Sequence, residues 1–175
     1  MIRKLAVSAA LALAFVPSAI ASPAPTSADR ARAVNDCQVL RPAMNTALGA
    51  GTFGRAFGTA QRARMDAFRN CVARLARAEH QNRHQAVAEC DESTAASTSA
   101  SAFGQCVAAT MRAKSRADRR ANMNAARTCK AERADTAFAS AHDGKTFAEF
   151  YGTSANDRNA YGKCVSAHAK AQNDA

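Results

Sequence analysis

The sequence predicts an all-α protein, an antiparallel four-helix bundle made of repeated helical hairpins that disulfides link together. The first observation behind this is the distribution of helix-breaking residues. No glycine or proline occurs between residues 59 and 103, nor between 105 and 143, so both stretches can form long helices. Apolar residues in the first stretch (Met65, Phe68, Val72, Leu75) share one helical face. With breaks at 49–58, 93–101 and 143–157, four helices are expected at about 29–48, 60–92, 102–142 and 157–172.

The second observation is a low content of large apolar residues. After residue 21 the chain contains no Ile, no Trp and only three Leu, namely Leu40, Leu48 and Leu75, and it is strongly basic. Such a composition alone is typical of disorder. Abundant alanine, the best helix former, argues for helices instead. A core this small needs covalent support, which six cysteines can supply in an exported chain.

The first residues predict export. Arg3 and Lys4 form a short positive region, an apolar stretch runs from Leu5 to Val16, and small residues precede a cut after Ala21. This is the layout of a secretory signal peptide, and the stretch is shorter than the about 20 residues that span a bilayer. We therefore expect a signal peptide at 1–21, a flexible segment at 22–28, a single helical domain at 29–172, and a secreted or extracytoplasmic protein.

The third observation is an internal repeat around the cysteines. Two patterns alternate along the chain: Ala-x-x-x-Cys, which ends at Cys37, Cys90 and Cys129, and Ala-aromatic-x-x-Cys-Val, which contains Cys71, Cys106 and Cys164. A further echo links the Thr-Phe segment that begins at Thr52 to the one that begins at Thr146. Self-similarity of this kind predicts three copies of one unit, the middle one shortened.

The repeat also predicts the disulfide pairing. Cys71 and Cys90 share one expected helix and would lie about 28 Å apart, and Cys106 and Cys129 share another and would lie about 35 Å apart. A disulfide needs Cα atoms within about 7 Å, which excludes both pairs. Each inter-helix loop is flanked by one cysteine of each pattern. The expected bonds are therefore Cys37–Cys71, Cys90–Cys106 and Cys129–Cys164.

The last quarter of the chain carries a recognisable motif. It reads Cys129-Lys-Ala-Glu-Arg133, then Phe147, Tyr151-Gly-Thr153 and Asn159-Ala-Tyr-Gly-Lys-Cys-Val-Ser166. This resembles a motif in small exported alanine- and arginine-rich actinobacterial proteins of unknown function. Ser154 stands where that motif usually has Asn. The resemblance implies export and a helical fold, and it transfers no catalytic residue.

A basic stripe is the one surface feature that implies a partner. Arg112, Arg116 and Arg120 follow one another at a spacing of four residues on the third expected helix. One interpretation is a contact surface for a polyanion, such as an anionic cell-envelope polymer. The other is that these arginines only keep an alanine-rich helix soluble. No aromatic residues are interleaved for base stacking, so nucleic acid is the least favoured polyanion.

Other chemistry has weaker support. His80 and His84, with Glu79 beside them, have a spacing that can place two imidazoles on one metal ion, although the polar residues around them also fit a hydrated helix face. A hydrolase with a site in the loops would be favoured by a pocket that holds two carboxylates, or by a Cys or Ser beside His142 or His168. We expect no catalytic residue, no metal and no cofactor. The sequence thus favours an exported, non-catalytic helical protein, with a hydrolase or a metal-binding bundle as alternatives.

Overall fold

The computed structural model describes residues 24–58, 63–94, 100–153 and 157–174 as helices and the turns between them. The expected signal peptide lies outside these residues. The helices are α1 Ser27–Leu48, α2 Thr52–Phe57, α3 Ala63–Thr94, α4 Ala100–Ala134, α5 Phe138–Ala141, α6 Phe147–Tyr151 and α7 Ala160–Asn173. Within the described residues there is no β-strand, which confirms the predicted all-α class. None of the described helices combines the length and apolar character needed to cross a bilayer.

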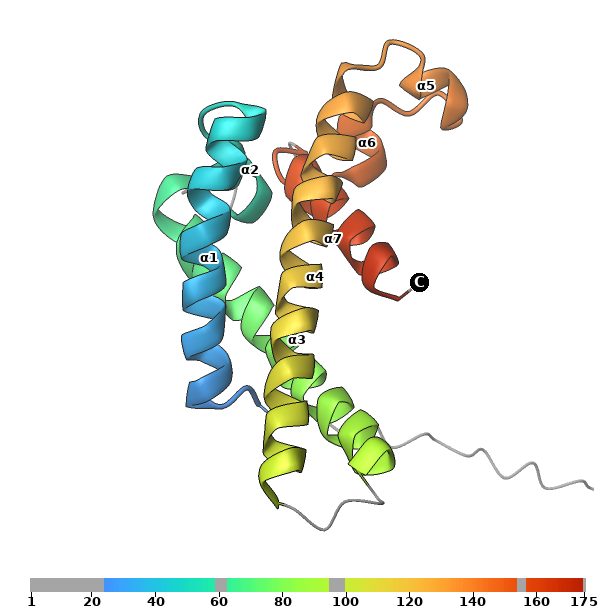
Figure 1. Cartoon of the computed structure of the whole chain (residues 1–175). Coiled ribbons are helices and arrows are strands. Elements are labelled where there is room, and N and C mark those ends of the chain that lie inside the picture. The colour runs from blue at the N-terminus through green and yellow to red at the C-terminus, as the bar shows by residue number, and fades with distance from the viewer. Residues whose placement is uncertain (1–23, 59–62, 95–99, 154–156, 175) are drawn as a thin grey trace, which may run out of the picture.

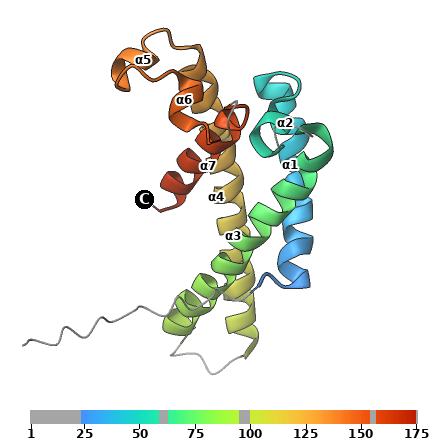
Figure 2. The same cartoon turned by 180° about the vertical axis from the view of Figure 1, so that it is seen from behind.

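The long helices pack in a bundle-like arrangement. Helices α1 and α4 lie side by side, and α3 crosses the back of both (Figure 1, Figure 2). Helix α7 packs mainly against α4, while α2 lies near the end of α1, and α5 and α6 lie near the end of α4. Helix α1 begins at a capping box, in which Thr26 and Asp29 satisfy each other's backbone N–H groups. This start is two residues earlier than expected.

The three disulfides have the predicted pairing. Cys37–Cys71 joins α1 to α3, Cys90–Cys106 joins α3 to α4, and Cys129–Cys164 joins α4 to α7. Their Cα atoms are 6.1, 5.9 and 6.0 Å apart. Bonds of this kind persist in oxidising compartments, so they indicate an oxidising environment.

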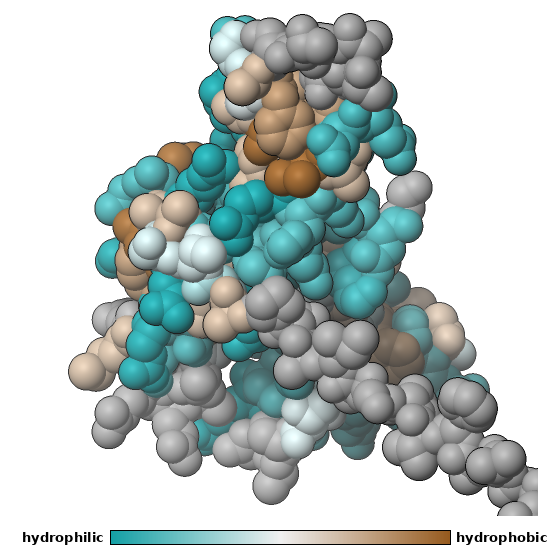
Figure 3. All heavy atoms as spheres, turned by 90° about the horizontal axis from the view of Figure 1, so that it is seen from below, coloured by the Kyte–Doolittle hydropathy of each residue, from teal (hydrophilic) through white to brown (hydrophobic). Residues whose placement is uncertain are grey.

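The core is small and rich in alanine. Around the first and third disulfides, alanines pack with a few larger side chains, among them Leu40, Met44 and Val165. Seen from below, hydrophilic residues cover most of the described surface and brown, apolar residues form only small patches (Figure 3). Because burial of apolar area is the main stabilising force, little of that stability is available here without crosslinks.

The sequence prediction of helix ends was wrong in three places. The expected helix 102–142 ends at Ala134, because the Asp135 carboxylate accepts the backbone N–H of Ala137 and so competes with helix continuation. The expected breaks at 49–58 and 143–157 contain the short helices α2 and α6. Helix α6 is started by a capping box between Thr146 and Glu149.

Removing one disulfide should cost a large share of the stability. The chain-entropy estimate is about 3 kcal/mol for the separation of 16 residues in Cys90–Cys106 and somewhat more for 34 in Cys37–Cys71. We expect C90A/C106A and C37A/C71A to melt well below the wild type, with C37A/C71A the less stable of the two. Thermal unfolding followed by far-ultraviolet circular dichroism measures this. Melting temperatures equal to that of the wild type would show that packing alone holds the bundle.

Candidate functional site

Arginine side chains line a concave surface between α1 and α4. A cavity of about 430 Å³ is bordered by Arg32 of α1 and by Arg112, Arg116 and Arg119 of α4. A second cavity of about 360 Å³ continues along the same two helices, bordered by Arg116, Arg119, Arg120 and Arg127. The two cavities share Arg116 and Arg119 and so lie next to each other along α1 and α4. We call the surface that they form together the arginine groove (Arg32, Arg112, Arg116, Arg119, Arg120 and Arg127).

The structure brings the three sequence-predicted arginines into this groove. Arg112, Arg116 and Arg120 are all exposed, and among the described residues no carboxylate is within salt-bridge distance of them. In the part of the chain that the structure describes, the only carboxylate that borders the groove is Asp36, which is ion-paired with Arg119. The groove therefore carries a net positive charge that neighbouring side chains leave mostly uncompensated.

Sequence reasoning missed the opposite wall of the groove. Arg32 belongs to α1 and is eighty residues from Arg112 in the sequence, and only the packing of α1 against α4 brings the two together. The available signal was weak, since Arg32 is one of several arginines near the start of the first helix.

A buried group of carboxyls lies beneath the groove. Asp36 of α1, Glu79 of α3 and Asp118 of α4 are 6%, 1% and 6% exposed. Burial is the main cause that raises the pKa of each of the three. Repulsion from the Asp36 carboxylate raises the pKa of Glu79 and of Asp118 further, whereas Arg119 opposes the rise at Asp36 itself. Glu79 accepts a hydrogen bond from Ser115, while its Oε2 atom is buried without a partner. This group burdens the fold at neutral pH, because its charged form is poorly solvated.

The predicted pair His80 and His84 fits the expectation of a hydrated helix face only in part, because His84 is exposed whereas His80 is not. His80 is buried, its Nδ1 atom lies 3.2 Å from Asp29 Oδ2, and its Nε2 atom lies 3.2 Å from His84 Nε2. Arg83 also donates to Asp29, at 2.9 Å. Glu79, which stands beside His80 in the sequence, accepts a hydrogen bond from Ser115. The pair thus belongs to a network that ties α3 to the start of α1.

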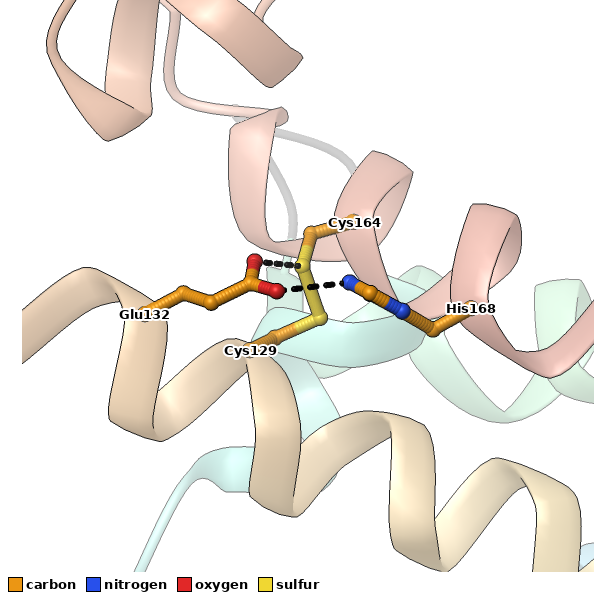
Figure 4. A group of neighbouring side chains, drawn as sticks. All are labelled: Cys129, Glu132, Cys164 and His168. Carbon is orange, nitrogen blue, oxygen red and sulfur yellow. Dashed lines mark hydrogen bonds and ion pairs between the residues drawn. A yellow bond between two sulfur atoms is a disulfide. The ribbon is translucent and has the colours of Figure 1, made fainter. Parts of the chain in front are cut away.

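A second polar cluster surrounds the disulfide Cys129–Cys164. Glu132 Oε1 lies 2.9 Å from His168 Nε2, and Glu132 Oε2 lies 3.5 Å from Cys164 Sγ (Figure 4). The Tyr151 hydroxyl donates to Glu132 Oε2 at 2.9 Å. Burial, with the nearby Glu132 carboxylate, raises the pKa of Tyr151 to about 12, so this hydroxyl stays a donor at neutral pH.

The surroundings of His142 and His168 can be compared with the expectation that a hydrolase would have a Cys or Ser beside one of them. His168 does lie beside a cysteine, but that sulfur is part of a disulfide and has no lone thiolate with which to attack. His142 stacks on Phe138, with ring centroids 3.9 Å apart. Among the described residues, no cysteine is free.

Comparison with models of protein families, with curated proteins and with solved structures finds no match to this chain. Its function must therefore be argued from its own geometry.

Replacing Glu79 by Gln should stabilise the protein at neutral pH. A raised pKa means that the folded chain binds more protons than the unfolded chain between the usual carboxyl pKa and the raised one. Stability therefore falls as pH rises through that window. E79Q removes this loss, because a neutral amide is less costly to bury than a carboxylate with an unpaired oxygen, and the gain is about 1–2 kcal/mol.

Melting temperatures between pH 4 and pH 8 test this prediction, with E89Q as the control, because Glu89 is an exposed carboxylate on the same helix. The advantage of E79Q should grow with pH and vanish near pH 4. If E79Q is less stable than the wild type at pH 8, Glu79 contributes as a charged group and the argument fails.

Proposed function

We propose that this protein is an exported, non-catalytic bundle of repeated antiparallel hairpins that binds an anionic envelope polymer through the arginine groove. The observation that carries the proposal is the pair of adjacent cavities bordered by six arginines and one carboxylate. A solubilising role needs exposed charge only, and it gives no reason for arginines of two different helices to face the same groove.

The dimensions of the groove favour a linear ligand. Arg112 and Arg127 are fifteen residues apart on α4, which is about 22 Å along a helix. Arg112, Arg116 and Arg120 follow at steps of about 6 Å, so a chain with regularly spaced phosphates or carboxylates could contact several at once. Guanidinium groups suit both anions, because they donate two parallel hydrogen bonds to either one.

The remaining properties of the chain support an envelope polymer over nucleic acid. No aromatic side chain of the described residues borders the two cavities, so bases would find no stacking surface there. The signal peptide predicted from the sequence sends the chain out of the cytoplasm. The net charge is +10 for the whole sequence and +8 without Arg3 and Lys4 of the predicted signal peptide, and it attracts any polyanion over long range.

Binding should be steeply dependent on salt and on the groove arginines. We expect wild-type protein to bind isolated cell-wall polymer with an affinity that falls about 10³-fold between 50 and 200 mM salt, as for a protein with about six phosphate contacts. R112Q/R116Q/R120Q should keep its helicity and lose about half of the salt dependence. The matched control is R69Q/R77Q/R133Q, which removes the same charge from exposed positions outside the groove.

Sedimentation with wall polymer, anionic vesicles and DNA at both salt concentrations separates the possible partners. Selective retention on wall polymer supports the proposal. Equal loss of binding in the two triple variants would mean that total charge, and not the groove, is responsible. No retention on any of the three at 50 mM salt would leave the arginines with a solubilising role.

A substitution of Arg32 tests whether the ligand binds in the groove between α1 and α4 or only to the arginines of α4. If the ligand lies between the helices, R32Q should weaken binding about as much as R112Q, because both side chains border the same cavity. If the ligand lies on α4 only, R32Q should bind like the wild type. Affinities of the two single variants at 50 mM salt, with melting temperatures as the check on folding, decide between these cases.

A further inference from the structure

The first and third disulfides differ in the residues at equivalent positions of the repeat, which are apolar around the first disulfide and polar around the third. The third residue after the leading cysteine is Leu40 in the first case and Glu132 in the other. The fourth residue after the second cysteine is Leu75 or His168. The sixth residue of the Thr-Phe segment is Phe57 or Tyr151.

At the first disulfide these three positions form core. Leu40, Leu75 and Phe57 are 1%, 3% and 5% exposed and belong to the apolar cluster around Cys37–Cys71. The third disulfide has a carboxylate, an imidazole and a phenol there, all bonded to one another. Apolar side chains would cover the sulfurs and stabilise the bundle better, so three polar replacements at one place call for a chemical reason.

The ligand atoms of this cluster lie close together. Oxygen of Glu132, nitrogen of His168 and the sulfurs of Cys129 and Cys164 are all within 4.8 Å of one another. Cys129 and Glu132 come from α4, and Cys164 and His168 come from α7, so the four side chains converge from two facing helices (Figure 4). Two thiolates, an imidazole and a carboxylate are ligands that Zn²⁺ takes in tetrahedral sites.

We propose that reduction of the Cys129–Cys164 disulfide by a small thiol or dithiol converts this cluster into a Cys₂-His-Glu site for Zn²⁺. Two reductant thiols supply two electrons and two protons, the S–S bond breaks, and the reductant leaves as its own disulfide. Zinc then binds the two sulfurs as thiolates, and their two protons are released to solvent. This inference is independent of the proposed polymer binding.

The geometry fits this change with a small movement. Zn–S bonds of about 2.3 Å and Zn–N bonds of about 2.0 Å place tetrahedral ligands about 3.3–3.8 Å apart. The contacts from Glu132 to His168 and to Cys164 are already 2.9 and 3.5 Å. The two sulfurs must separate once the bond between them is broken, and the other ligand atoms, which are all within 4.8 Å of one another, need to move only slightly.

Tyr151 would support the carboxylate ligand. Its hydroxyl donates to Glu132 Oε2, as outer partners of metal ligands commonly do. In the oxidised protein the sulfurs carry no charge and are held together, so the same four residues cannot enclose zinc. The disulfide and the metal are therefore alternative links between α4 and α7, and oxidation would release the metal.

Titration of reduced full-length protein with Co²⁺, followed by competition with Zn²⁺, tests the site. Reduction with a phosphine under anaerobic conditions should give one Co²⁺ per chain with strong thiolate-to-cobalt absorption, which zinc displaces. Oxidised protein should bind at least about 100-fold more weakly. H168Q and E132Q should each weaken zinc binding by at least about 10-fold, and Y151F by about 10-fold, the usual effect of losing an outer partner.

The other disulfides provide the controls. C129A/C164A should lose the site, whereas C90A/C106A should keep it, because Thr110 occupies the position that corresponds to His168. Circular dichroism shows whether zinc restores helicity to reduced wild type but not to reduced H168Q. The proposal is overturned if reduced wild type binds no cobalt, if H168Q and E132Q bind zinc as tightly as the wild type, or if the oxidised protein does so.

Discussion

The crosslinks run in sequence through the bundle, from α1 to α3, from α3 to α4 and from α4 to α7. The first and third lie in an apolar cluster in which eight of the 20 buried residues are alanine, and alanine buries little area per residue. Cys37, Cys71, Cys90, Cys129 and Cys164 are themselves fully buried. The relative positions of the long helices, and so the shape of any surface between them, depend on these bonds more than on side-chain packing.

The same small core explains why the interior tolerates so many polar groups. Asp36, Glu79 and Asp118 occupy places where three helices meet, and a core with more leucine would have filled that space. Their energetic burden is reduced by specific partners: Asp118 accepts from Asn82 and Asn173, each at 2.7 Å. Asp36 also connects the interior to the surface through Arg119, so the inner end of the arginine groove is held by the buried carboxyls.

Much of the architecture could be predicted from the sequence, because the length of the expected helices restricts which cysteines can form disulfides with each other. Two cysteines on one rigid helix cannot meet, and each inter-helix loop is flanked by one cysteine of each repeat pattern. Together these two observations predicted the pairing that the structure has. The short helices α2 and α6 escaped prediction, because five or six residues give no periodicity and their starts depend on local bonds such as the Thr146–Glu149 box. The groove was predicted from one wall only: the α4 stripe is visible in the sequence, whereas its pairing with Arg32 depends on tertiary packing. The cluster at Glu132 was missed although a signal existed, namely the polar residues at positions where the first unit has Leu40 and Leu75.

Helix α4 connects the two candidate sites. It carries five of the six groove arginines, and it is crosslinked at one end to α3 and at the other to α7. No disulfide joins α4 to α1, so the width of the groove is set indirectly, through α3. Loss of Cys90–Cys106 would therefore change the groove, because it breaks the only covalent path from Arg32 to Arg112 apart from the chain itself. Opening of Cys129–Cys164 lies outside that path. The redox state at the far end of α4 can change the link to α7, with zinc in place of the disulfide, while the arginines keep their arrangement.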